Sequence, residues 1–181
     1  YSLSAAYSMG INRPRFSDLN PFRYYTTTTD YVSGNAYLSA SITHNAELSF
    51  SHKGPYAVAY AYQLKDGVGY VTRFTPDNSQ YTTPQNYIDY RKYGVYASYQ
   101  KNFTAWWNVK VGGELFYAKS QSSIDDSQPS NSTSWSGKLE GTSDVAFNSQ
   151  RTLLFTIQYL HMFPHDEDLV RYKALSLLNA S

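Results

Sequence analysis

The chain of 181 residues has no cysteine and few charged residues. Without cysteine it can form neither a disulfide framework nor a thiolate metal site. Charged residues make up 16% of the chain, against roughly 25% in typical soluble domains, and the formal net charge is only +1. Because this balance gives neither a basic field nor an acidic tail, we expect no nucleic-acid partner.

Long apolar runs and familiar catalytic motifs are also missing. No run approaches the roughly 18 residues of a transmembrane helix, and the mean hydropathy is −0.52. The sequence contains no P-loop, GxGxxG, HExxH or Ser/His/Asp order, so it predicts neither an enzyme nor a cofactor. These absences leave a transmembrane β-barrel possible, because its strands are only half apolar and average out as polar.

Aromatic residues and two-residue alternation are what the chain does have. Aromatics reach 17% and tyrosine alone contributes 19 residues. Apolar and small or polar residues alternate in about eight segments, which predicts about eight β-strands. The positions expected on one apolar face include Leu3, Tyr7, Leu48, Phe50, Val58, Tyr60, Tyr62, Leu64, Tyr93, Val95, Leu115, Tyr117, Trp135, Leu139, Phe155, Ile157 and Tyr159.

The connections between these segments alternate between short and long. Short ones are expected at 53–55, 101–103 and 148–150, and long ones at about 10–43, 67–91, 120–134 and 164–169. Bacterial outer-membrane barrels have short periplasmic turns and longer extracellular loops, with Tyr and Trp girdles near both membrane interfaces. The pattern therefore predicts an all-β antiparallel transmembrane barrel, although tyrosine is also simply a good strand residue.

Two groups of ionisable residues could carry chemistry. The segment "HMFPHDED" (161–168) holds metal-binding residue types, but its spacing matches no known site, so we expect a solvated turn and no metal. Glu114, Glu140 and Asp144 accompany Lys110 and Lys138 on polar strand faces and resemble an acid/base pair. We favour charges that pair across strands facing a watery lumen.

The segment 11–31 interrupts the alternation with turn-forming, basic and aromatic residues. Pro14 and Pro21 cannot donate to a strand ladder, and Asp18 and Asn20 favour turns. Arginines and tyrosines provide forked donors and flat surfaces suited to sugars, peptides or cofactors. An alternative is a loop packed on its own barrel or on an interior plug. The candidate ligand-binding residues are Arg13, Arg15, Asp18, Asn20, Arg23, Tyr24, Tyr25 and Tyr31.

Two motifs carry a family resemblance. "RPRFSDLNPFRYY" (13–25) and "GNAYLSASITHNAELSFSHKG" (34–54) resemble the C-terminal barrel region of TonB-dependent outer-membrane receptors of the Bacteroidota. Ala40 departs from the motif, because a proline is expected there. The closing "VRYKALSLLNAS" (170–181) is also similar to this region, so the resemblance covers essentially the whole chain.

The resemblance implies a protein of the Gram-negative outer membrane that actively imports a bulky nutrient such as a glycan, a peptide or a metal complex. Residues 1–181 would be a single β-barrel segment, roughly the last eight strands of a barrel of about twenty-two. Implied partners are outer-membrane lipid, an N-terminal plug with the remaining strands, TonB and a surface lipoprotein. The start at Tyr1 inside an alternating segment also suggests a piece of a longer protein.

Two other readings stay open. The first is a self-contained eight-stranded outer-membrane barrel with a structural or adhesive role, since about 180 residues suit that size. The second is a soluble β-sandwich that binds carbohydrate.

Overall fold

The computed structural model is built almost entirely of β-strands and describes residues 1–124, 130–148, 152–167 and 170–181. Its one helix among these residues is the single turn α1 (Phe16–Leu19), and no described helix is long and apolar enough to cross a membrane. The strands are β1 (Ser2–Asn12), β2 (Arg23–Tyr25), β3 (Tyr31–Ser33), β4 (Ser41–Ser51), β5 (Pro55–Phe74), β6 (Gln80–Asn102), β7 (Trp107–Ser122), β8 (Ser130–Ala146), β9 (Leu154–Met162), β10 (His165–Glu167), β11 (Val170–Tyr172) and β12 (Leu175–Ala180).

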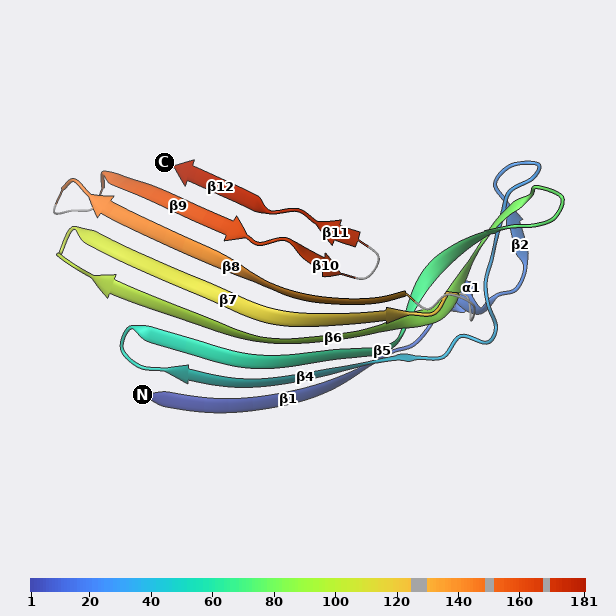
Figure 1. The fold of residues 1–181 in the computed structure, drawn as a ribbon, viewed down its shortest axis with the longest axis horizontal. Coiled ribbons are helices and arrows are strands. Elements are labelled where there is room, and N and C mark those ends of the chain that lie inside the picture. Colours follow the sequence, from blue (N-terminus) through green and yellow to red (C-terminus); the bar gives the residue numbers. More distant parts are fainter. Residues whose placement is uncertain (125–129, 149–151, 168–169) are drawn as a thin grey trace.

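Eight of these strands form one antiparallel sheet in the order β1-β4-β5-β6-β7-β8-β9-β12. This confirms the all-β antiparallel fold predicted from the alternation. Figure 1 shows a single curved layer with both chain ends at the end of the short turns. Among the described residues β1 and β12 do not pair with each other, so the sheet stays open. The short β3 pairs with β2 and, in parallel, with the outer part of β6.

The strand register divides the side chains between two faces, because directly opposed residues point to the same side of a sheet. Tyr93 of β6 lies opposite Ala61 of β5 and Tyr117 of β7, and Tyr117 lies opposite Trp135 of β8. We call this side the apolar face. Its large residues are exposed and include Leu3, Tyr7, Leu48, Phe50, Tyr93, Val95, Tyr99, Val111, Leu115, Trp135, Leu139, Phe155, Ile157 and Tyr159.

The opposite side of the sheet, the polar face, carries the charged residues and the buried aromatic cluster. Its members include Glu47, Lys92, Tyr96, Lys110, Glu114, Phe116, Lys138, Glu140 and Asp144. Tyr90, Phe116 and Ala118 form the buried cluster, and Tyr62 and Leu64 pack against it. A sheet with one exposed apolar face and one polar face is the pattern of a transmembrane barrel wall.

The prediction for β5 was wrong in its choice of face. The register places Val58, Tyr60, Tyr62 and Leu64 on the polar face, because Tyr60 lies opposite Gly94 and Ala59 lies opposite Val95. The alanines between them therefore share the apolar face with the large side chains of β6. Alternation within one strand finds two faces, but only the neighbouring strands decide which face meets lipid.

Tight turns lie at one end of the sheet, at 52–54 and 103–106, while part of the expected turn at 148–150 falls outside the described residues. At the other end, the segment 67–91 is not the expected loop. β5 and β6 continue as a paired hairpin up to a turn at 75–79. Gly67 and Pro84 within this segment are residue types that commonly interrupt strands. A β-bulge next to Gly67 accommodates the first, and Pro84 is fully buried opposite Tyr70.

The other expected loops also contain structure. The segment 10–43 begins within β1 and includes α1, β2 and β3. The segment 164–169 contains β10, which pairs with β11 in a small hairpin. Residues 168–169 lie outside the described part. The expected loop 120–134 is shortened by β7 and β8, and its residues 125–129 are likewise not described. Strand pairing thus extends farther toward the long-loop end than the sequence predicts.

Candidate functional site

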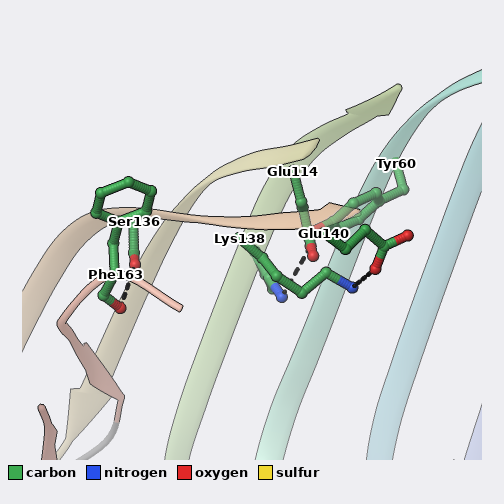
Figure 2. A network of polar contacts seen from close by, with 7 residues as sticks. Tyr60, Glu114, Ser136, Lys138, Glu140 and Phe163 are labelled. Atoms are coloured by element: carbon green, nitrogen blue, oxygen red, sulfur yellow. Dashed lines mark hydrogen bonds and ion pairs between the residues drawn. The ribbon is translucent and has the colours of Figure 1, made fainter. Parts of the chain in front are cut away.

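The central feature of the polar face is a ladder of paired charges across β6, β7 and β8. Lys92 Nζ lies 3.4 Å from Glu114 Oε1, and Lys138 Nζ lies 3.2 Å from Glu140 Oε2. We call these four residues the charge ladder, and Figure 2 shows Lys138 and Glu140 in contact, beside Glu114. The side chains are between 17% and 30% exposed, so each pair is partly hydrated.

Tyrosines from neighbouring strands complete the charge ladder. Tyr60 donates a hydrogen bond to Glu114 Oε1, and Tyr96 donates one of 2.6 Å to Glu140 Oε1. The ammonium of Lys92 also lies 4.0 Å from the centre of the Phe116 ring, within cation–π distance. Each carboxylate therefore has its own lysine and its own tyrosine as partners.

The third carboxylate of the expected group is not part of the charge ladder. Asp144 accepts a 2.8 Å hydrogen bond from the Thr156 hydroxyl of β9. The structure thus separates the acidic residues that the sequence grouped, and it gives each a fixed local partner. Such an arrangement suits a hydrated wall lined by charges of both signs. That the chain is not an enzyme stays a prediction.

The loop between β1 and β4 folds against the outer part of the β5–β6 hairpin. The carbonyl groups of Asp18 and Asn20 accept hydrogen bonds from Asn35 and Gly34, at 2.7 and 2.9 Å. A Cβ at Gly34 would lie 2.3 Å from Asn20 O, so only glycine allows this close approach. Tyr70 of β5 donates a 3.1 Å hydrogen bond to Asp18, and this bond, with some burial, raises the pKa of Tyr70.

A stack of aromatic and cationic groups holds the middle of the loop. The guanidinium of Arg23 lies 4.8 Å from the ring centre of Tyr31, and Tyr31 stacks on Tyr81 of β6 at 5.5 Å with 11° between the planes. The parallel pairing of β3 with β6 brings these tyrosines together. Two of the predicted ligand contacts, Arg23 and Tyr31, thus help to attach the loop to its hairpin.

The eight candidate ligand-binding residues therefore fall into two sets. Four make the contacts with other segments described above, namely Asp18, Asn20, Arg23 and Tyr31. The other four have exposed side chains: Arg13, Arg15, Tyr24 and Tyr25. Of these, Tyr25 also packs on Tyr31, with 5.5 Å between the ring centres. We refer to these four as the exposed set, because they are available to an external molecule.

Sequence reasoning missed Asn86, which joins three segments. Its amide nitrogen donates to Ser39 O at 3.1 Å and to Asp66 O at 2.6 Å, and its amide oxygen accepts the N–H of Ser39 at 2.9 Å. An asparagine inside a segment expected to be loop gave no signal of this role. Only the pairing of β5 with β6 shows that it faces the returning chain.

The histidine-rich segment is used for packing in the structure. The ring of His165 stacks on Tyr172 at 4.8 Å and meets the edge of Phe116 at 5.6 Å, which places the β10–β11 hairpin over the polar face. Arg171 pairs with Asp166 at 3.2 Å. In the described ranges, no three histidine or acidic side chains are grouped as a metal site would require.

Comparison with known proteins places these features in a family. The model of the outer membrane protein beta-barrel family matches residues 1–181. No curated protein sequence matches the chain. Among solved structures, the siderophore receptor PirA from Pseudomonas aeruginosa is similar over 99% of this chain, with 13% identity and a TM-score of 0.47. The chain spans 39% of that receptor's length.

Proposed function

Because the chain belongs to the outer membrane protein beta-barrel family, we propose that it forms part of the barrel wall of a TonB-dependent receptor that imports a bulky nutrient. The proposed cargo is a glycan, a peptide or a metal complex. The proposed location is the outer membrane of a Gram-negative bacterium of the Bacteroidota, with these strands at the C-terminal side of the barrel.

The observation that carries this proposal is the charge ladder on an open, curved sheet. The interior of an eight-stranded barrel is just wide enough for its own side chains to fill it. Here Lys92, Glu114, Lys138 and Glu140 keep between 17% and 30% of their side chains exposed, and β1 and β12 do not meet among the described residues. A hydrated inner wall on an open sheet supports a wide lumen, and therefore passage or a plug.

The exposed set supports a role in ligand capture at the long-loop end. Two arginines can form paired hydrogen bonds with carboxylate, phosphate or sugar oxygens, and two tyrosines offer flat surfaces to a sugar ring or a peptide. Active import also needs an energy source, so we propose an interior plug and TonB as partners, with a surface lipoprotein assisting capture.

Uptake by cells tests the proposal. Cells with and without the gene are offered three labelled probe mixtures: fluorescent oligosaccharides, fluorescent oligopeptides and ferric-ion chelates. We expect at least one mixture to accumulate only in cells with the gene, and a protonophore to abolish that uptake. Two results together would support the structural or adhesive alternative instead. The cells would accumulate none of the mixtures, and the protein would form only a small closed barrel.

The absence of cysteine allows a direct test of the two faces. Single cysteines are placed at Lys110 on the polar face and at Leu139 on the apolar face. In intact protein in lipid vesicles, a membrane-impermeant maleimide should label the first from the lumen and leave the second unlabelled. Equal labelling of both positions would contradict a membrane wall and favour a soluble sandwich.

Binding at the exposed set is tested with the variant Y24A/Y25A. We expect it to lower binding of the accumulated probe by about tenfold, because each lost aromatic contact costs on the order of 0.5–1 kcal/mol. Tyr37 is the matched control, since it is 95% exposed on the same loop but is not a candidate contact. If Y37A and Y24A/Y25A bind the probe equally, the exposed set does not contact it.

A further inference from the structure

Two positive charges lie side by side on the apolar face. Arg91 of β6 and Lys119 of β7 are directly opposite each other, and they are the next residues outward from the opposed pair Tyr93 and Tyr117 on that face. Among the described residues, no carboxylate lies within ion-pair distance of either. Asp89, two residues beyond Arg91, binds the N–H of Asp66 through Oδ1 at 3.0 Å.

Like charges in directly opposed positions, with Cβ atoms about 5 Å apart, destabilise a sheet unless something compensates them. The position of Arg91 and Lys119 on the sheet indicates which external group can neutralise their charge. Tyr93, Tyr117 and Trp135 form an aromatic row on neighbouring strands, and such girdles lie at the level of the lipid headgroups. Arg91 and Lys119 are therefore at the bilayer surface, on the long-loop side of that row.

A groove lies directly below the aromatic row on the same face. It has a volume of about 840 Å³, and its apolar side chains include Val95, Leu115, Trp135, Leu139 and Phe163. Gly113 and Gly137 also line it. Glycines leave no side chain between the neighbouring strands, so the sheet surface is hollowed between bulky residues. A groove of this volume and apolar lining fits hydrocarbon chains.

We propose that Arg91 and Lys119 bind the phosphate of a phosphorylated lipid of the outer leaflet, and that an acyl chain of the same lipid lies in the groove. Forked arginine donors and a lysine ammonium suit phosphate oxygens. The dianionic headgroup removes the repulsion between Arg91 and Lys119, which we call the basic pair. Because the groove begins below the girdle, the two ends of one lipid molecule are bound at once. A soluble anion would use only the basic pair.

Lipid binding to the intact, delipidated protein in detergent tests this proposal. Native mass spectrometry measures binding of bisphosphorylated lipid A, and its dephosphorylated form serves as the headgroup control. We expect the variant R91Q/K119Q to bind lipid A at least tenfold more weakly, since each basic residue near an anionic surface contributes about 1 kcal/mol. The matched control K53Q/K101Q removes two charges at the short-turn end and should bind as the parent does.

A second variant tests the groove. Gly113→Leu fills it, because a Cβ there has only the flexible Leu139 side chain as a close neighbour, at 3.2 Å. We expect weaker binding of lipid A but unchanged binding of its deacylated, phosphorylated headgroup. All variants must keep the heat-modifiable gel band of a folded barrel, and K119Q alone replaces the double variant if that fails to fold.

Two outcomes would overturn the proposal. Equal binding of lipid A by the parent and by R91Q/K119Q would exclude the basic pair as its site. Displacement of lipid A by millimolar inorganic phosphate, with no effect of Gly113→Leu, would show a site for soluble anions instead.

Discussion

The sheet has two parts that are stabilised in different ways. In the part bounded by the aromatic residues, long strands pair in regular register and the two faces separate apolar from charged side chains. Beyond it, β5 and β6 continue almost alone, and β3 and the loop at 13–40 attach to them through individual polar contacts. The first part depends on its surroundings, lipid on one side and water on the other. The outer part depends on a few specific side chains.

The largest expected effect comes from placing a charge on the apolar face. Val111 is 50% exposed there and lies about midway between Trp107 and Tyr117 on β7. Val111→Arg should lower the free energy of unfolding in vesicles by about 2–4 kcal/mol, because arginine near the bilayer midplane loses its hydration. Urea titration in lipid vesicles measures this. Ala6→Arg on the polar face, directly opposite Glu47, is the control and should change stability little. Equal losses for both variants would remove the distinction between the faces.

The next largest effect concerns the outer part. Gly34→Ala places a Cβ 2.3 Å from Asn20 O and 2.7 Å from Asp18 O, so the loop must move away from its hairpin at a cost of about 1–3 kcal/mol. Hydrogen exchange of the loop amides should become faster while exchange in β7 and β8 stays the same. Faster exchange throughout the sheet would show that the two parts are not independent.

A smaller loss is expected at Asn86. Asn86→Ala removes three exposed hydrogen bonds that join the returning chain and the bulge, which should cost about 0.5–1.5 kcal/mol locally. Asn131 of β8 is a suitable control, because among the described residues its side chain accepts just a 3.3 Å bond from the exposed Gln121. Limited proteolysis should cleave the segment near Ser39 in the Asn86 variant, whereas the Asn131 variant should match the parent.

The smallest effect is a pH dependence at the hairpin tip. Hydrogen bonds from the hydroxyl of Thr75, from the backbone N–H of Asp77 itself and from the hydroxyl of Ser79 hold the pKa of Asp77 below its ordinary value. The charged carboxylate therefore stabilises the turn above about pH 3.9, its unfolded value, and this contribution is lost as the pH falls through the lower folded value. Amide shifts at 75–79 should report the transition, and Asp77→Asn should remove it.

The membrane-spanning part could be predicted from sequence because it follows simple alternation. Leu115, Tyr117 and Trp135 were placed on the correct face, since large residues alternate with small or charged ones. Tyr60 was misplaced because both it and the alanine beside it are compatible with lipid, and only the register with Gly94 decides between them. A single strand carries no information about its neighbour.

The outer part was less predictable because its residues look like a loop. Gly67, Asp66 and Pro84 are turn-forming types, yet a bulge and a buried proline keep them in strands. The candidate ligand residues were found by type, but sequence could not separate Asp18, which binds Tyr70, from the exposed Arg13. That separation depends on which segments return to touch the hairpin.

The bulge beside Gly67 has a practical consequence for labelling the protein on living cells. The turn at 75–79 lies at the far end of a hairpin that has already left the main sheet, and Asn78 holds a positive φ of 62° that a glycine-rich linker can adopt. A short epitope inserted between Asp77 and Asn78 should therefore be displayed to antibodies without disturbing barrel assembly.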